Sequence, residues 1–199
     1  MTDYHFYEPT GETGLPYSPV NAIIAPRPIG WISSLAPDGT PNLAPYSYFN
    51  VFNRRPPIVG FASIGYKDSV RNIEATGEFT WNLVTHPLGE AMDKTSAQLP
   101  PEVDEFEVAG LAKRPARLVA PPLVDAARAS FECRLTQIER LRLASGAETD
   151  TWMVFGEVVG VHIDKSLLVD GLFDTAAADI IGRGGGPATY FRLGEEFEM

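Results

Sequence analysis

The chain has 199 residues, of which 44% are hydrophobic and 21% are charged. That balance is typical of a folded globular protein, and no shift in composition marks a domain boundary, so we expect one domain covering residues 1–199. The 26 acidic and 16 basic side chains give a formal net charge of -10, which opposes binding to a phosphate backbone. A role in nucleic-acid binding is therefore not expected.

Cysteine and histidine content also excludes several classes of protein. Cys133 is the only cysteine, so no disulfide can form within the chain, and the three histidines lie too far apart in sequence to suggest a metal site. No stretch approaches the roughly 18 consecutive apolar residues of a membrane helix, and the first residues lack the pattern of a secretion signal. We expect a cytoplasmic protein without a metal centre that does not enter membranes.

Short segments rich in β-branched and aromatic residues, separated by 17 prolines and 18 glycines, predict a mainly β protein. Residues 29–35 and 42–46 form a predicted hairpin, because the Pro-Asp-Gly step at 37–39 is a turn sequence. Residues 58–63 and 79–84 are two further strand candidates. Between them, residues 67–76 have helical spacing, and Gly77 is suited to end that helix.

The second half of the chain continues the pattern of strands. A short helix is expected within 87–98, and the proline-rich, acidic stretch 100–124 is expected to be a surface excursion. Residues 130–143 and 151–163 are the longest strand candidates, with the Ser-Gly step at 145–146 as the turn between them. The order of elements favours a closed or nearly closed Greek-key β-barrel with short peripheral helices.

The sequence lacks the signatures of several common catalytic sites. We find no Gly-x-Ser-x-Gly nucleophile, no P-loop and no His-Glu-x-x-His helix, and the glycine run 182–186 lacks the strand-to-helix context of a dinucleotide site. His162 stands alone among apolar neighbours in a predicted strand, where a histidine is more often structural than catalytic. Cys133 is expected to be a buried apolar residue. We therefore assign no catalytic side chain.

An ordered series of motifs carries the most specific signal in the chain. They lie at 27–34 (RPIGWISS), 42–50 (NLAPYSYFN), 56–57 (PP), 67–73 (KDSVRNI) and 77–79 (GEF), with further matches at 105–111, 131–133, 155–158 and 182–190. In this order they closely resemble the flavin reductase-like, FMN-binding split-barrel family, including its flavoredoxin-type members. The resemblance covers nearly the whole chain and implies a Greek-key split β-barrel that binds FMN.

The residue types also fit a flavin, which needs donors at the ring edge, a flat wall for the ring and a seat for its phosphate. Candidate ring-edge donors are Ser33, Ser34, Ser47 and Asn50. Candidate ring walls are Trp31, Tyr48 and Phe49. The start of the predicted helix favours an anion, and the candidate phosphate ligands there are Lys67 and Ser69, with Ser63 and Arg71 close in sequence. The expected cofactor-binding set also contains Ala62, Asp68 and Arg183.

Each of these residues has a plainer interpretation when it is taken singly. The Lys-Asp-Ser step at 67–69 is also a common solvated start of a helix, and serines are common in turns. The ordered resemblance favours the functional interpretation.

The resemblance implies an FMN-binding oxidoreductase, either an NAD(P)H:flavin reductase or a flavoredoxin-like electron carrier. FMN is the expected cofactor, with FAD second and NAD(P)H as the candidate electron donor. Short-chain reductases of the family often carry a Gly-Asp-His step, and at the matching places this chain has Asp150 and Thr151, followed by Trp152, which weighs against direct oxidation of NAD(P)H. A homodimer and a redox partner protein are also expected. The alternative is a non-catalytic barrel that binds flavin or a partner.

Overall fold

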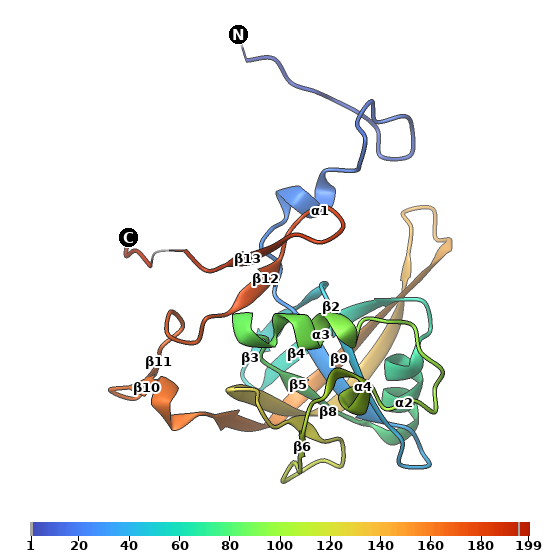
Figure 1. The fold of residues 1–199 in the computed structure, drawn as a ribbon. Helices are drawn as coiled ribbons and strands as arrows, with labels where there is room; N and C mark the ends of the chain where they lie inside the picture. Colours follow the sequence, from blue (N-terminus) through green and yellow to red (C-terminus); the bar gives the residue numbers. More distant parts are fainter. Residues whose placement is uncertain (1, 195) are drawn as a thin grey trace.

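The computed structural model describes residues 2–194 and 196–199, and its largest element is a seven-stranded antiparallel sheet (Figure 1). The strands follow the order β2-β1-β5-β8-β9-β4-β3. Their bounds are β1 (Gly30–Leu35), β2 (Pro41–Tyr46), β3 (Phe49–Arg54), β4 (Pro57–Ile64), β5 (Glu78–Asn82), β8 (Ala129–Arg142) and β9 (Glu148–Ile163). The two edge strands, β2 and β3, follow each other directly in the chain.

Side-chain contacts show that this sheet curls into a nearly closed barrel. Phe61 on β4 and Phe79 on β5 have ring centroids 6.1 Å apart, although two other strands separate β4 from β5 in the sheet. The ring centroid of Tyr46, on the edge strand β2, lies 4.5 Å from that of Phe61, although β2 and β4 stand near opposite ends of the strand order. The barrel therefore closes over an aromatic core and leaves one seam, between β2 and β3.

The predicted mainly β fold is confirmed, and so are its local elements. β1 pairs with β2 around a turn in which Gly39 has a φ of 92°. Helix α2 (Asp68–Thr76) crosses between β4 and β5 and ends at Gly77, whose φ is 74° and whose N–H donates to the Ile73 carbonyl. β8 and β9 form the long hairpin, with Gly146 at its tip. Positive φ is available to glycine without steric cost, which explains these turn positions.

The remaining elements are short. The helices are α1 (Val20–Ile23), a 3-10 turn η1 (His86–Leu88), α3 (Gly89–Lys94), α4 (Glu105–Ala109) and η2 (Lys165–Leu167). The small strands are β6 (Lys113–Arg114), β7 (Leu123–Val124), β10 (Leu168–Val169), β11 (Leu172–Phe173), β12 (Ile181–Arg183) and β13 (Tyr190–Arg192). The helix expected within 87–98 is therefore limited to η1 and the six residues of α3. No helix of the described chain is both long and apolar enough to span a membrane.

The stretch 100–124 runs over the surface, as its prolines and acidic residues predict, but part of it packs tightly against the sheet. Phe106 and Leu123 are fully buried, and Phe106 packs in a second apolar cluster on the outer face of the sheet. Outward-facing polar side chains fix the stretch in place: Thr80 donates to the Pro122 carbonyl, and Asn82 accepts from the Val124 N–H. Composition alone does not reveal this, because the partners lie on distant strands.

The segment around α1 and the C-terminal hairpin of β12 and β13 lie side by side above the barrel (Figure 1). Arg27 pairs through its backbone with Arg183 on β12, and its guanidinium donates to carbonyls of Asn21, Ile24 and Gly184. A side chain at Gly185 would collide with Ala22, so only glycine permits this approach. The buried guanidinium thus joins the N-terminal segment to the C-terminal hairpin.

Candidate functional site

Two neighbouring cavities lie beside the seam of the barrel. One, of about 350 Å³, is enclosed by the last residues of β2, the first turn of α2 and residues 95–101. The other, of about 610 Å³, is enclosed by residues 47–52, the segment 23–28 and Met153. Consecutive residues, Tyr46 and Ser47, line the first and second cavity respectively. Two cavities of different chemistry therefore lie next to each other at the end of β2.

The end of the site at α2 is suited to an anion. Lys67, Ser69 and Arg71 line it, and the first amides of α2 have no partner within the helix. Asn42 donates to the Ser69 Oγ at 2.9 Å, which orients the hydroxyl and leaves its proton for another acceptor. Asp68 also lines the cavity but forms an ion pair with Arg71 at 2.5 Å. The predicted phosphate residues thus meet in one place.

The other end of the site is flat and aromatic. Ser47, Tyr48, Phe49 and Asn50 all line it, as the sequence predicts for the ring end of a flavin site. The Tyr48 hydroxyl donates to Asn21 at 3.1 Å, and the Arg27 guanidinium lies 5.7 Å from the Tyr48 ring centroid. The Asn50 Oδ1 accepts the Val51 N–H, so the side-chain NH₂ group of Asn50 remains available as a donor.

Trp31 does not form a ring wall, and that expectation is wrong. Its side chain is fully buried in the outer apolar cluster, and its indole N–H donates to the Thr95 Oγ1 at 3.0 Å. Trp31 alternates with Ile32 along β1, so the two side chains point to opposite faces of the sheet, and both faces are covered. A wall residue that the motif does reveal is Phe49, which stacks on Trp81 with centroids 5.5 Å apart.

The two serines of β1 are also buried and do not line either cavity. Ser33 is fully buried, and its Oγ has no hydrogen-bond partner. Ser34 is buried beside Asn42 and Asn72, whose side-chain amides lie 3.4 Å from its Oγ. The expectation that these serines donate to a ring edge is therefore corrected. Ser34 instead supports Asn42, which in turn orients Ser69.

Three further residues of the predicted set lie near the site without lining it. Ser63 is fully buried and donates to the Gly65 carbonyl at 2.8 Å. Ala62 is buried, and its N–H donates to the Tyr48 carbonyl, which holds the ring end of the site against β4. Arg183 is not brought to the phosphate end, because its guanidinium donates to the Gly186 and Pro187 carbonyls inside the C-terminal hairpin.

Two residues that sequence reasoning missed shape the anion end. Asn42 was visible only as the first residue of a motif. Glu105 lines the same cavity and accepts the Leu43 N–H at 3.0 Å, although its position in an acidic stretch suggests solvent. Burial raises the pKa of the Glu105 carboxyl above its ordinary value, and this effect outweighs the lowering by the Leu43 hydrogen bond. Glu105 therefore ionises less readily than an ordinary glutamate.

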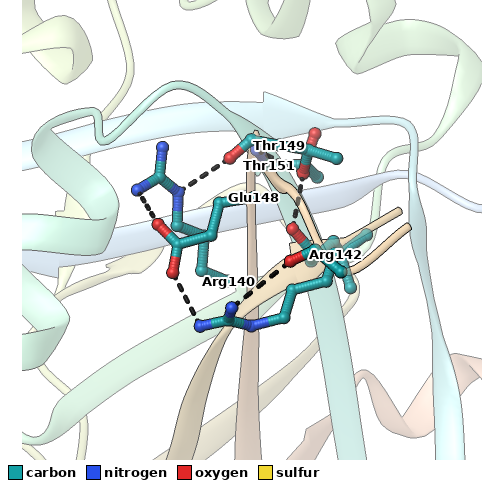
Figure 2. Close-up of polar contacts among 7 residues, drawn as sticks. Arg140, Arg142, Glu148, Thr149 and Thr151 are labelled. Carbon is teal, nitrogen blue, oxygen red and sulfur yellow. Dashed lines mark hydrogen bonds and ion pairs between the residues drawn. The ribbon is translucent and has the colours of Figure 1, made fainter. Parts of the chain in front are cut away.

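The tip of the β8–β9 hairpin is held by charged side chains (Figure 2). Glu148 forms ion pairs with Arg140 at 2.6 Å and Arg142 at 2.7 Å. The Arg140 guanidinium also lies 5.3 Å from the Trp152 ring, which packs edge-on against Tyr66. Trp152, which follows Asp150 and Thr151, is thus held in place by packing.

Comparison with known proteins agrees with this geometry. Residues 24–179 match the family described as "Flavin reductase like domain". The chain belongs to this family. The match includes both ends of the seam site, from the Arg27 motif to the end of the barrel strands.

Solved structures of the family share the fold of this chain. Nitrilotriacetate monooxygenase component B from Bacillus cereus is 28% identical, with a TM-score of 0.91 and 100% of both chains covered. A split-barrel flavin reductase from Shewanella frigidimarina is 25% identical, with a TM-score of 0.79 over 90% of this chain and 88% of that one. Flavoredoxin of Desulfovibrio vulgaris (Miyazaki F) is 22% identical and has a TM-score of 0.77, with 88% of this chain and 91% of that one covered, which shows a common fold.

The raised pKa of Glu105 predicts a pH dependence of stability. A carboxyl whose folded-state pKa is raised stabilises the fold below its ordinary value of 4.5, and this contribution is lost as pH rises through the folded pKa. The variant Glu105→Gln keeps an oxygen acceptor but cannot ionise. We expect its free energy of unfolding, relative to the wild type, to increase from pH 4 to pH 8 in urea titrations. An equal difference at both pH values would contradict the assignment.

Proposed function

We propose that the protein binds FMN along the seam and works as an FMN-dependent oxidoreductase. The observation that carries this proposal is that an anion seat, at the start of α2, lies next to an aromatic, donor-lined cavity at the turn between β2 and β3. A flavin mononucleotide has these two ends in one molecule. The seat offers places for one phosphate, so we rank FAD second.

Each end of the site has a defined task in this proposal. Lys67, Ser69 and the free amides of α2 bind the phosphate, and Asn42 orients Ser69. Tyr48 and Phe49 flank the ring, while the amide of Asn50 donates at its edge. When bound, FMN supplies the acceptance and release of electrons. The chain itself holds, orients and shields the cofactor, which is why no catalytic side chain is required.

We propose NAD(P)H as the electron donor, with transfer to free flavin or to a redox partner protein. The membership of the flavin reductase like family supports the reductase form. Asp150 and Thr151, which stand where the short-chain reductases carry Asp and His, favour the flavoredoxin-like form, in which FMN stays bound and the protein carries electrons. A non-catalytic flavin-binding barrel is the remaining alternative.

The phosphate seat can be tested with one variant and two ligands. Lys67→Ala removes a charge-assisted contact worth roughly 1.5 to 3 kcal/mol, so FMN should bind about tenfold more weakly or worse. Riboflavin, which lacks the phosphate, should bind as it does to the wild type. Fluorescence titration measures both affinities, and Lys165→Ala, in η2 outside both cavities, is the matched control. Equal weakening of both ligands, or no weakening of FMN, would remove Lys67 from the seat.

The donor can be tested by mixing the FMN-loaded protein with NADH or NADPH without oxygen. Oxidation of the nucleotide lowers the absorbance at its own band, and reduction of FMN bleaches the flavin band. The reductase form predicts bleaching with at least one nucleotide. A protein that binds FMN and reacts with neither nucleotide, but is reduced by dithionite, would be a carrier or a binder instead.

We also propose a homodimer. Large apolar side chains are exposed along the N-terminal segment, among them Tyr4 at 82%, Phe6 at 84% and Ile23 at 75%, and on the edge strand β3 at Val51 and Phe52. An edge strand with exposed apolar residues is normally covered by another chain. Light scattering should therefore give a mass of twice 21.7 kDa. A monomeric mass with FMN bound would contradict the dimer.

A further inference from the structure

A third cavity lies away from the seam. It is at the end of the β8–β9 ladder that lies farthest from the hairpin tip. Its volume is about 700 Å³, and its walls come from residues 114–118, residues 125–128 and the last residues of β9. It shares no lining residue with either seam cavity. Its size lies within the roughly 300–1,000 Å³ of small-molecule sites.

The carboxylate at the base of this cavity is fully engaged. Glu132 is 1% exposed and accepts the backbone N–H groups of Arg117, Leu118 and Val119 together with the ring N–H of His162. Burial opposes ionisation of Glu132, but these donors prevail and lower its pKa. Glu132 is therefore ionised, and its two oxygens are already occupied by these four N–H donors. Its charge holds residues 117–119 as one wall of the cavity.

His162 has a single tautomer that is consistent with its two partners. Its Nε2 lies 2.5 Å from the Glu132 Oε1, and a carboxylate can only accept, so Nε2 carries the proton. Its Nδ1 lies 3.2 Å from an Nη of Arg114, and a guanidinium can only donate, so Nδ1 is the acceptor. The sequence interpretation of His162 as a structural residue misses this link between a buried carboxylate and an arginine in a cavity wall.

The arginines of the cavity differ in how much of their donor capacity is used. Arg128 is occupied, because it donates to Asp164, Ser166 and the Ala177 carbonyl. Within residues 2–194 and 196–199, the Arg114 side chain makes one hydrogen bond, to His162, and one ion pair, in which its Nε lies 3.6 Å from Asp125, too far for a hydrogen bond.

Arg117 adds a second guanidinium with unused donors. It is exposed, and its side chain makes no hydrogen bond or ion pair within residues 2–194 and 196–199. Each guanidinium offers five N–H donors in a planar fork that matches the geometry of an oxyanion. Three carboxylates also line the cavity: Glu132 accepts four N–H groups, Asp164 pairs with Arg128, and Asp125 lies 3.6 Å from Arg114. Arg114 and Arg117 therefore supply the donors that remain for a ligand.

Apolar side chains complete the cavity. Leu118 is 51% exposed, Val161 56% and Ile163 37%, and all three line it beside the arginines. An inorganic anion would fill only part of a space of about 700 Å³ and would leave these side chains in water. An organic ligand with an apolar body and an oxyanion head would contact both parts of the wall.

We propose that this cavity binds a small organic anion, with a carboxylate or phosphate head held by Arg114 and Arg117 and an apolar body against Leu118, Val161 and Ile163. On binding, Arg114 turns from the His162 Nδ1 to the anion. His162 stays on Glu132 through Nε2, so the wall at 117–119 keeps its shape. The site is separate from the seam and does not depend on the flavin assignment.

Three probes of similar body test the proposal by isothermal titration: benzoate, phenyl phosphate and neutral benzamide. The titrations are made on the purified protein with and without saturating FMN, so that occupation of the seam cannot be mistaken for this site. We expect at least one of the two anions to bind with and without FMN, and at least tenfold more tightly than benzamide. Tighter benzoate identifies a carboxylate ligand, and tighter phenyl phosphate identifies a phosphate ester.

Variants and an imidazole signal locate the binding. Arg114→Gln and Arg117→Gln should each weaken the anion about tenfold, whereas Arg54→Gln, an exposed arginine outside the cavities, should leave it unchanged. The nitrogen-15 resonance of the His162 Nδ1 should shift on binding, because it loses a donor. Arg117 is exposed and its replacement should not affect folding, so its result stands even if Arg114→Gln unfolds.

The proposal would be overturned by any of three results. These are no binding of either anion at millimolar concentration, equal binding of benzamide, or binding that Arg117→Gln leaves unchanged while the His162 Nδ1 resonance does not move.

Discussion

Packing across the seam of the barrel determines where the candidate site lies. Tyr46 and Phe61 come from opposite ends of the strand order, and their contact at 4.5 Å requires the sheet to curl until β2 approaches β4. Two residues then connect β2 to β3, and their backbone is available to a ligand because neither edge strand has a further partner there. The same curl places the start of α2 beside the end of β2. The anion seat and the aromatic end are thus products of one closure.

A second consequence is that both faces of the sheet are covered. The inner face packs on itself, and the outer face of β1, β5 and β8 carries polar residues that bind the stretch 100–124 through its backbone. Glu132 is the extreme case, since one buried carboxylate accepts three consecutive N–H groups. Buried polar groups of this kind are costly unless they are paired, and here the pairing holds a long irregular segment in one conformation. The cavity beside His162 exists because that segment is fixed.

Local chemistry made much of the fold predictable. Gly39, Gly77 and Gly146 have positive φ at the turns and helix end where the sequence indicates them, and the two longest strands lie on either side of the predicted Ser-Gly turn at 145–146. The anion end was also predictable, because Lys67 and Ser69 are neighbours in sequence at a helix start. The burial of Trp31 and Ser33 was not predictable, because only the tertiary structure shows that residues 100–124 cover their face of β1. Asn42 and Glu105 act through contacts with residues 27 and 62 positions away, which no local pattern reveals.

The central claim is that the seam holds FMN with its phosphate at the start of α2 and its ring at the turn between β2 and β3. A crystal structure of the protein grown with FMN tests it most directly. The account predicts the phosphate within hydrogen-bonding distance of Lys67, Ser69 and the first amides of α2, and the ring beside Tyr48 and Phe49. Density for FMN in the cavity of Arg114 and His162 with an empty seam, or a phosphate bound at the Tyr48 end, would contradict it.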